Sequence, residues 1–579
     1  MFYRFTGFIV FVKMKDEIYF LKNGNIYEIS TNKIIKRNTT KMCGIIDVKS
    51  NVIYGYNKKK HPKKKCYIDC GFEKNIIGFI PIQQFIYSKN IYAILNYSNE
   101  ISLCDTIGYI GDYESEKKYI KSKCISNWDS NEKYKLKDIT INNKINNRVD
   151  LTNKKIFSID PPNCKDIDDA IHIEKIKHNV YEIGIHIVDV SDIIEMDSKL
   201  DNEISKRGKT IYLQDETINM IPDEIMNELS LVENKTRKTF STIFNIDYET
   251  GNIINYHFCK SIIKNSKNMT YDEAQNQIDK KKNTDLYDIF MIGQKIYNKM
   301  YVEIETNENI MRKTYDVHTM IEILMIITNM VVAETIVKKY PENVVLRTQN
   351  KNDKIIKISH DFMNNKFYEK YILLNKNKAM YVVGLSDIGH ADMQLKYYTH
   401  FTSPLRRYID IINHRLLYGA INDEGEIYQD NYLDICMEYY NTLYKWYNYH
   451  ERHYNNIDKI FEIYKNENNK KVNGNIIRFV ENDNVYAIVY ILQLDNIFPV
   501  IILSKHAKKI IEYEMNSEYF KYVSNVDFKL SLFDNIVVEI CICILSKNKI
   551  HIKLIDPDPY VMYQKNLSIN YDIEDEIII

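Results

Sequence analysis

The sequence contains little glycine and carries no net charge. Both features limit what its composition can indicate about function. Glycine supplies 17 of the 579 residues, whereas tyrosine supplies 47. This bias is typical of AT-rich codons, so the abundant tyrosine carries little functional weight. Lys plus Arg and Asp plus Glu both number 78. Global charge therefore gives no argument for nucleic-acid binding, and only local basic patches can give one.

The ten cysteines lack the spacing of a zinc site or a disulfide framework. Their nearest pairs are C-x-x-x-C and C-x-C, with no histidine cluster beside them. This pattern predicts a reduced intracellular compartment, the cytoplasm, with the nucleus as the alternative. Long hydrophobic runs are also missing at the start, where the apolar run between Arg4 and Lys13 is too short to span a bilayer. We expect no signal peptide, no transmembrane segment and no membrane partner.

The length suggests three or four domains, and the pattern predicts an α+β multidomain protein. Short β-rich runs indicate small barrels over 1–112, and a Lys/Asn-rich connector follows over 113–149. Residues 150–465 alternate strand-like runs with strong helical patterns. The range 470–560 returns to short β-runs, which predict a last barrel, and 561–579 form an acidic tail.

Four aspartates gather in the segment FSIDPPNCKDIDDAIHI, which follows a strand-like run. Two prolines, Pro161–Pro162, prevent a regular strand or helix from continuing, so a tight loop should bring several carboxylates together. Carboxylates this close repel one another and need cations or raised pKa values. A set of carboxylate oxygen ligands favours magnesium, in the arrangement used for two-metal phosphodiester hydrolysis. The candidate metal ligands are Asp160, Asp166, Asp168 and Asp169.

A solvated acidic turn is the alternative interpretation of this cluster. An EF-hand loop does not fit, because the D-x-D-x-D-G spacing is absent.

An arginine pair in YYTHFTSPLRRYIDIINHRLL is the second candidate site. Ser403 followed by Pro404 predicts a helix start, with Arg406 and Arg407 in the first turn. Cations at that end oppose the helix dipole, which makes sense if an anion such as a scissile phosphate binds there. The alternative is an internal ion-pair network of Arg407, Asp410 and His414, and Arg406 is the better candidate for the phosphate.

Together these segments resemble the ribonuclease II (RNB) family of 3′→5′ exoribonucleases. The likeness covers about residues 149–465 and rests on SIDPPNCKDIDDAIHI, YEIGIHIVDVS, RGKTIYLQDETINMIPDEI, TYDEAQNQID and YTHFTSPLRRYIDIINHRLL. Among these proteins the segments most resemble the catalytic nuclease subunits of eukaryotic RNA exosomes, and we expect the N-terminal endonuclease domain of those subunits to be absent. The resemblance implies an RNB catalytic domain between cold-shock/OB-like barrels and an S1-like barrel. It also implies hydrolysis of single-stranded RNA to 5′-nucleoside monophosphates with two Mg²⁺ ions, for which Mn²⁺ can substitute.

The resemblance assigns roles to single residues. The four aspartates match the magnesium ligands, with Asp168 also catalytic, and Arg406 matches an arginine that contacts phosphate. Tyr212 matches a tyrosine that stacks on a base near the 3′ end, although such a strand aromatic is otherwise core. Glu322 is either an active-site acid or a helix-face charge.

The sequence departs from the family pattern at several positions. Ile323 stands where a second glutamate is usual. His390 matches a family histidine before a glycine-containing turn, but Asp392 replaces the glycine. The second stacking aromatic should fall between 300 and 318, where we cannot place it. The last barrel keeps Gly474 but lacks the later glycine of many S1 domains.

A basic run, KKKHPKKK at 58–65, has tyrosines close by and is either an RNA-binding patch or a solvated loop. The overall hypothesis is a processive, magnesium-dependent exoribonuclease, with single-stranded RNA as its partner and an exosome-like complex as a candidate assembly. The chief alternative is an RNA-binding or regulatory protein that has kept the fold and lost turnover, and a magnesium-dependent DNA nuclease is a third class.

Overall fold

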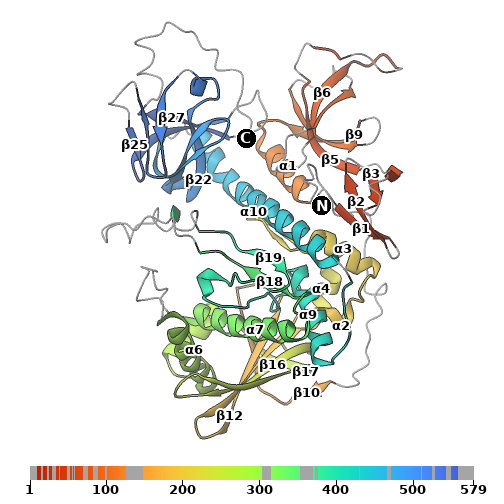
Figure 1. The fold of residues 1–579 in the computed structure, drawn as a ribbon, viewed down its shortest axis with the longest axis vertical. Helices are drawn as coiled ribbons and strands as arrows, with labels where there is room; N and C mark the ends of the chain where they lie inside the picture. Colours follow the sequence, from red (N-terminus) through yellow and green to blue (C-terminus); the bar gives the residue numbers. More distant parts are fainter. Residues whose placement is uncertain are drawn as a thin grey trace. The chain divides into compact units, whose positions relative to one another are not determined.

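The fold is described by a computed structural model that covers residues 10–557 with gaps (Figure 1). The expected acidic tail, the end of the expected connector and most of the range for the second stacking aromatic lie outside the described residues. Side chains are described from residue 41 onward. The undescribed stretches are 1–9, 15–16, 23–24, 29–33, 38–39, 49–51, 55–56, 58, 69–75, 83–88, 98–100, 126–147, 303–314, 352–369, 372–373, 375, 430, 466–470, 510, 524–528, 543–549 and 558–579.

The chain divides into two compact units. Unit 1 comprises Met1–Ser126, Asn352–Lys376 and Trp446–Ile579, and unit 2 comprises Asn127–Lys351 and Asn377–Lys445. Both units are built from sheets and helices, so the predicted α+β class is confirmed.

Unit 2 is organised around a six-stranded sheet of order β10-β17-β11-β12-β13-β16, in which β16 also pairs with β17. Figure 1 shows these last two as long neighbouring strands. β11 is parallel to β17, and its buried residues IFSI end in Asp160. The strands are β10 (Val149–Asp150), β11 (Ile156–Asp160), β12 (Asp169–Lys177), β13 (Val180–Val188), β16 (Thr236–Asp247) and β17 (Ile253–Thr270), with the pairs β14 (Ile211–Tyr212) and β15 (Thr217–Ile218), and β18 (Val345–Thr348) and β19 (Met380–Val383).

The helices of unit 2 include one, α7, that is long and apolar enough to cross a membrane by length and composition. In its most apolar window 67% of the helix is buried inside the protein, as expected for a core helix. It packs against α6 and α9. The helices are α2 (Val190–Ile193), α3 (Lys199–Arg207), α4 (Asp223–Leu229), α5 (Tyr271–Asp279), α6 (Thr284–Val302), α7 (Val317–Lys339), α9 (Tyr408–Ile421), the short η4 (Ala391–Met393) and the first part of α10 (Tyr432–Lys465).

The N-terminal part of unit 1 is β-rich, as the sequence predicts. A five-stranded sheet of order β7-β6-β5-β8-β9 encloses a core of Ile, Leu and Cys side chains, and its edge strands β7 and β9 contact each other. A four-stranded sheet, β1-β2-β3-β4, precedes it. The strands are β1 (Val10–Met14), β2 (Glu17–Lys22), β3 (Asn25–Glu28), β4 (Ile34–Arg37), β5 (Thr40–Ile46), β6 (Lys63–Ile68), β7 (Ile76–Pro81), β8 (Ile91–Tyr97) and β9 (Ser102–Tyr109).

The expected connector at 113–149 begins with helix α1 (Tyr113–Ile125). Glu114 and Glu116 stand in its first turn and Lys123 in its last, which suits the helix dipole. Tyr119 is buried and stacks on Tyr92 at 3.9 Å between ring centroids. This packing, rather than the polar composition, decides the structure of the segment.

The C-terminal part of unit 1 is a five-stranded sheet of order β22-β21-β20-β26-β27, whose edge strands β22 and β27 contact each other. The sheet therefore curls towards a barrel, as predicted, while the S1 type stays a prediction. A Cβ at Gly474 would lie 2.4 Å from Val489, so a larger residue would clash with the neighbouring strand. The strands are β20 (Lys471–Glu481), β21 (Val485–Ile491), β22 (Asn496–Leu503), β26 (Asn535–Ile542) and β27 (Ile550–Asp556), with a smaller sheet of β23 (Tyr513–Met515), β24 (Tyr519–Tyr522) and β25 (Lys529–Ser531).

His450, on α10 within unit 1, is a buried histidine that makes stability depend on pH. Its side chain is 2% exposed, and neither ring nitrogen has a hydrogen-bond partner among the described residues. Burial holds its pKa well below the ordinary value of 6.5, and nearby Lys123 and His453 lower it further. The folded protein thus keeps this ring neutral, while the unfolded chain takes up a proton below about pH 6.5.

Replacing His450 by leucine is therefore expected to flatten the loss of stability on acidification. Below pH 6.5 the wild type should lose up to about 1.4 kcal/mol per pH unit relative to the variant, because only the wild type carries this protonation linkage. Thermal unfolding at pH 5, 6 and 7 measures the difference. The exposed His506→Gln is the matched control and should follow the wild type. If His450→Leu also follows it, His450 is not the linked group.

Candidate active site

The aspartate loop starts where β11 ends and is fixed by hydrogen bonds within its backbone and by the Ser230 side chain. The Cys164 amide donates to the Pro161 carbonyl at 3.2 Å, and Asn163 takes a positive φ of 63°, so the chain turns sharply after the two prolines. Ser230, which is not part of the loop, forms two hydrogen bonds to it: its Oγ accepts from the Ile167 amide at 3.0 Å and donates to the Lys165 carbonyl at 2.7 Å. Asp169 then begins β12. The four aspartates are thus carried on one braced turn between adjacent strands.

Asp168 is the most enclosed of the four, with 3% of its surface exposed. Its carboxylate accepts from the Leu405 amide at 2.8 Å on Oδ1 and from Arg406 Nε at 3.2 Å on Oδ2. The Val188 amide donates to its backbone carbonyl at 2.9 Å. The two candidate sites, 238 residues apart in sequence, are therefore one site.

The arginine segment does not begin the helix where the sequence predicts. Residues 404–406 form a turn, and α9 begins at Tyr408 with Arg407 as an extended N-cap, φ −138° and ψ 122°. The reason is a tertiary pairing: the Thr210 amide donates to the Arg406 carbonyl, and the Tyr408 amide to the Gly208 carbonyl. The expectation that both arginines lie in a first helical turn is wrong.

Arg407 and Asp410 form the internal ion pair that was the alternative interpretation. The guanidinium contacts the buried carboxylate in a bidentate manner, at 2.9 and 2.8 Å. His414 lies apart from that pair, with its Nε2 2.9 Å from the Phe401 carbonyl oxygen. Arg406 instead turns to Asp168 and keeps 45% of its side chain exposed. Of the two arginines, only Arg406 contacts a carboxylate of the cluster and also keeps much of its side chain exposed.

Tyr212 also reaches the aspartates. Its hydroxyl donates to Asp166 Oδ2 at 2.8 Å, and 41% of the residue is exposed. Burial and the neighbouring Asp166 raise the pKa of the phenol well above its ordinary value, so the hydroxyl stays protonated and acts as a donor. An aromatic side chain thus stands beside the cluster with part of its surface open to solvent.

The electrostatics of the cluster favour an added cation. Burial raises the pKa of Asp160 to about 6 and that of Asp169 to about 7; repulsion by Asp166 adds to the rise at Asp160, and repulsion by Asp160 adds to the rise at Asp169. Asp160 Oδ2 is buried and has no hydrogen-bond partner among the described residues. An all-oxygen donor set with an unsatisfied buried carboxylate oxygen fits a hard divalent ion. The residues present therefore fit magnesium by their chemistry.

The predicted convergence of the aspartates is only partial. Within the described part of the chain, no three Asp, Glu, His or Cys side chains are arranged to share one metal ion. The contacts give the reason, since Asp168 is turned towards Arg406 and Leu405, and Asp166 towards Tyr212.

Two further site candidates are placed elsewhere in unit 2. Glu322 is exposed on α7. Exposure suits both an active-site acid and a helix-face charge, so the role of Glu322 stays a prediction. His390 is buried, and its ring packs against Tyr398 at 5.3 Å between centroids. A packed position of this kind suits a core histidine, and a role in RNA binding stays a prediction.

Sequence reasoning missed one aromatic pair beside the aspartates. Tyr271 follows Thr270, which pairs with Asp160 in the sheet, and the charges of Asp169 and Asp160 add to the effect of burial in raising its pKa to about 12. Its ring stacks on His318 at 3.8 Å. The TYDE capping box predicts where α5 starts, but only the parallel pairing of β11 with β17 brings Tyr271 to the site.

The basic run at 58–65 lies at the entry to β6 and carries an aromatic neighbourhood, although residues 56 and 58 lie outside the described part. Lys65 Nζ stands 4.9 Å from the ring centroid of Tyr67, and exposed Tyr54 and Phe79 contact each other at 4.6 Å between centroids. RNA contact at this surface stays a prediction.

Comparison with known proteins identifies the region that carries the site. Residues 148–423 match the family model of the RNB domain. The "Probable exosome complex exonuclease RRP44" of Caenorhabditis elegans is 31% identical over 342 residues, which is 49% of this chain and 36% of that protein. The chain therefore spans about a third of the length of that relative.

Two solved structures show the same fold. RNase R of Mycoplasma genitalium, in complex with ribose-methylated single-stranded RNA, has a TM-score of 0.66 at 17% identity and covers 94% of this chain and 98% of its own. Yeast Ssd1, described as a pseudonuclease, has a TM-score of 0.62 at 20% identity over 81% of this chain and 66% of its own. The match at 148–423, which contains the four aspartates and Arg406, shows that this chain carries an RNB domain.

Proposed function

We propose that this chain is a magnesium-dependent, processive 3′→5′ exoribonuclease that hydrolyses single-stranded RNA to 5′-nucleoside monophosphates. The observation that carries the proposal is the contact of Asp168 with Arg406 within an RNB domain. This contact joins the carboxylates, which can bind divalent ions, to a guanidinium group that can bind phosphate. The relative named as an exosome exonuclease and the structure of RNase R with single-stranded RNA support exonuclease action on RNA.

Each residue of the site has a part in the proposed reaction. Arg406, held by Asp168, binds the scissile phosphate and stabilises the charge that develops on it. The Tyr212 ring stacks on a base near the 3′ end without reading its identity. When bound, divalent ions activate water and neutralise phosphate charge. Water attacks phosphorus, the bond to the 3′ oxygen of the preceding nucleotide breaks, and that oxygen takes a proton. A nucleoside 5′-monophosphate leaves, and the shortened strand keeps a 3′ hydroxyl.

Several finer features belong to the same proposal. The four aspartates hold two Mg²⁺ ions, Glu322 lines the active site, and His390 and Arg407 support the RNA path. The barrels at 1–112 and 470–560 are of the cold-shock/OB and S1 types and attract RNA, in part through the basic run at 58–65. Assembly into an exosome-like complex and a cytoplasmic location complete the proposal.

The alternative is an RNA-binding protein without turnover. The likeness to the Ssd1 pseudonuclease favours it, as does Ile323 in place of a second glutamate. All four aspartates count against it.

A degradation assay separates the two functions. Single-stranded RNA labelled at the 5′ end or the 3′ end is incubated with the protein and Mg²⁺ or EDTA. The processive exonuclease converts 5′-labelled RNA to short end products with few intermediates and releases the 3′ label at once as mononucleotide, with Mg²⁺ only. A mobility shift without shortening would favour the binding protein. A DNA oligonucleotide of the same sequence tests the third class, and cleavage of DNA as fast as RNA would support it.

Replacing Arg406 by alanine is expected to lower the cleavage rate by about 10²–10³-fold, because a pre-oriented donor to the developing phosphate charge is lost. Single-turnover cleavage with Mg²⁺ measures the effect. Arg452→Ala, which removes an exposed arginine of α10, is the control for the loss of one positive charge and should cleave at the wild-type rate. Equal rates for both variants would remove Arg406 from the mechanism.

A further inference from the structure

Tyr212 meets the aspartate cluster through its hydroxyl and not through its ring. The hydroxyl donates to Asp166 Oδ2 at 2.8 Å, while 41% of the residue remains exposed. We propose that Tyr212 is a positioning residue for Asp166, whose carboxylate its hydroxyl orients to bind a divalent ion. This inference rests on the proposed function, and it adds to the base-stacking role of the ring a second role for the hydroxyl.

The position of Tyr212 is set by a rigid frame. Ile211 before it is fully buried, and Tyr212 itself pairs with Thr217 in the β14–β15 ladder. The amide of Thr210 donates to the Arg406 carbonyl at 3.0 Å, so the strand bearing Tyr212 is bonded directly to the arginine segment. Tyr212 and Arg406 therefore approach neighbouring carboxylates, Asp166 and Asp168, from two bonded segments of backbone.

The contacts of Asp166 leave one oxygen suited to a ligand. Oδ2 accepts the Tyr212 hydroxyl, whereas Oδ1 is approached only by the Cys164 thiol, at 3.4 Å, in the hydrogen bonds of the described residues. A thiol is a weak donor. When a strong donor anchors one oxygen of a carboxylate, the other oxygen points in a fixed direction. Hydrogen bonds of this kind to a metal-binding carboxylate raise its affinity for the metal.

The same side chain would then link the substrate to the metal site. A base stacked on the Tyr212 ring lies next to a carboxylate that the Tyr212 hydroxyl holds. The ring makes the stacking contact, whereas the hydroxyl makes the contact with Asp166. Loss of the hydroxyl alone should therefore act on metal binding and spare stacking, while loss of the whole side chain should act on both.

The test compares Tyr212→Phe and Tyr212→Ala with the wild type. Tyr513→Phe is the matched control, since it removes another hydroxyl that bonds a carboxylate, Glu481 at 2.7 Å, in unit 1. Mn²⁺ affinity is measured by calorimetry without RNA, and affinity for single-stranded RNA by fluorescence anisotropy in EDTA. We expect Mn²⁺ affinity about tenfold weaker in Tyr212→Phe, with RNA affinity in EDTA unchanged. Tyr212→Ala should weaken both, and Tyr513→Phe neither.

Wild-type Mn²⁺ affinity in Tyr212→Phe would overturn the inference and leave the exonuclease proposal intact, because the wild type would still bind the ion and cleave RNA. A wild-type protein that binds no Mn²⁺ at this site would overturn the metal-dependent function and the inference with it. Weaker RNA binding by Tyr212→Phe in EDTA would also contradict the inference, because the hydroxyl would then serve the RNA and not the carboxylate.

Discussion

Asp168→Asn is expected to lower the rate of RNA cleavage on the order of 10³-fold while RNA binding stays near the wild-type level. The asparagine side chain has nearly the same shape and can still accept the Leu405 amide hydrogen bond. It lacks the negative charge that holds Arg406 and that attracts a divalent ion, and the loss of several kcal/mol of transition-state stabilisation corresponds to this factor. Because Asp168 is 3% exposed, water cannot replace the missing charge.

Two measurements check this prediction. Single-turnover cleavage of 5′-labelled RNA with Mg²⁺ gives the rate, and anisotropy in EDTA gives the affinity. Asp434→Asn, at an exposed position of α10, is the control for the same chemical change and should cleave normally. Turnover of Asp168→Asn at the wild-type rate would remove Asp168 from the mechanism.

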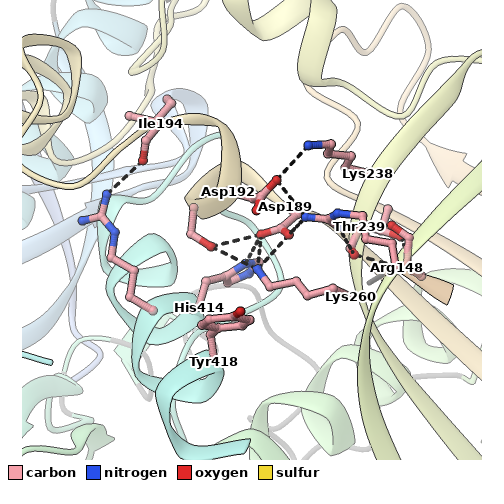
Figure 2. A network of polar contacts seen from close by, with 12 residues as sticks. Arg148, Asp189, Asp192, Ile194, Lys238, Thr239, Lys260, His414 and Tyr418 are labelled. Atoms are coloured by element: carbon pink, nitrogen blue, oxygen red, sulfur yellow. Dashed lines mark hydrogen bonds and ion pairs between the residues drawn. The ribbon is translucent and has the colours of Figure 1, made fainter. Parts of the chain in front are cut away.

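A second large effect is expected on stability, at Asp189. Figure 2 shows its carboxylate among Arg148, Lys260 and His414. Arg148 Nη2 lies 2.6 Å from Oδ2, and Lys260 Nζ lies 2.6 Å from Oδ1. The residue is fully buried, and its pKa lies well below the ordinary range because these cations outweigh the cost of burial. Arg148 also donates to the carbonyls of Thr239 and Ser261, so the network ties β16 and β17 to the residues before α2.

Asp189→Ala should destabilise unit 2 by about 3–5 kcal/mol, because it leaves the largely buried Lys260 without this counter-ion and leaves the buried Arg148 with the partly exposed Asp192 alone. The corresponding fall in Tm is on the order of 10 °C, followed by circular dichroism. Asp192→Asn is the matched control: this aspartate shares Arg148 and also contacts Lys238, but 32% of its side chain is exposed, so a loss of about 1 kcal/mol or less is expected.

The pair Asp189→Leu with Lys260→Met tests the cause. Removing both charges should recover a large part of the lost stability, since no buried charge of that pair stays without a partner. If Asp189→Ala instead matches Asp192→Asn, the network is not a stabilising element of the fold.

What the sequence could predict follows from how local each feature is. The strand before Asp160, the turn at Pro161–Pro162 and the β-rich ends depend on short-range patterns, and the structure has them. The start of α9 was predicted wrongly, because the pairing of Thr210 with Arg406 overrides the local preference of Ser403 and Pro404 for a helix start.

For the candidate site, the sequence could suggest residues but could not predict the contacts between them. Asp168 meets Arg406 across 238 residues, and Asp166 meets Tyr212 across 46. No periodicity in the chain encodes either distance, and only the sheet and the paired backbone segments create them. The same holds for Tyr271, which reaches the aspartates through a parallel strand pairing.

The most direct test of the central claim is an anomalous difference map from crystals of the protein soaked in Mn²⁺. We expect anomalous peaks among the carboxylate oxygens of Asp160, Asp166, Asp168 and Asp169, with Arg406 facing them. A map without a peak there, with the four carboxylates hydrogen-bonded to protein or solvent alone, would contradict the assignment of this loop as the metal-binding centre of an exoribonuclease.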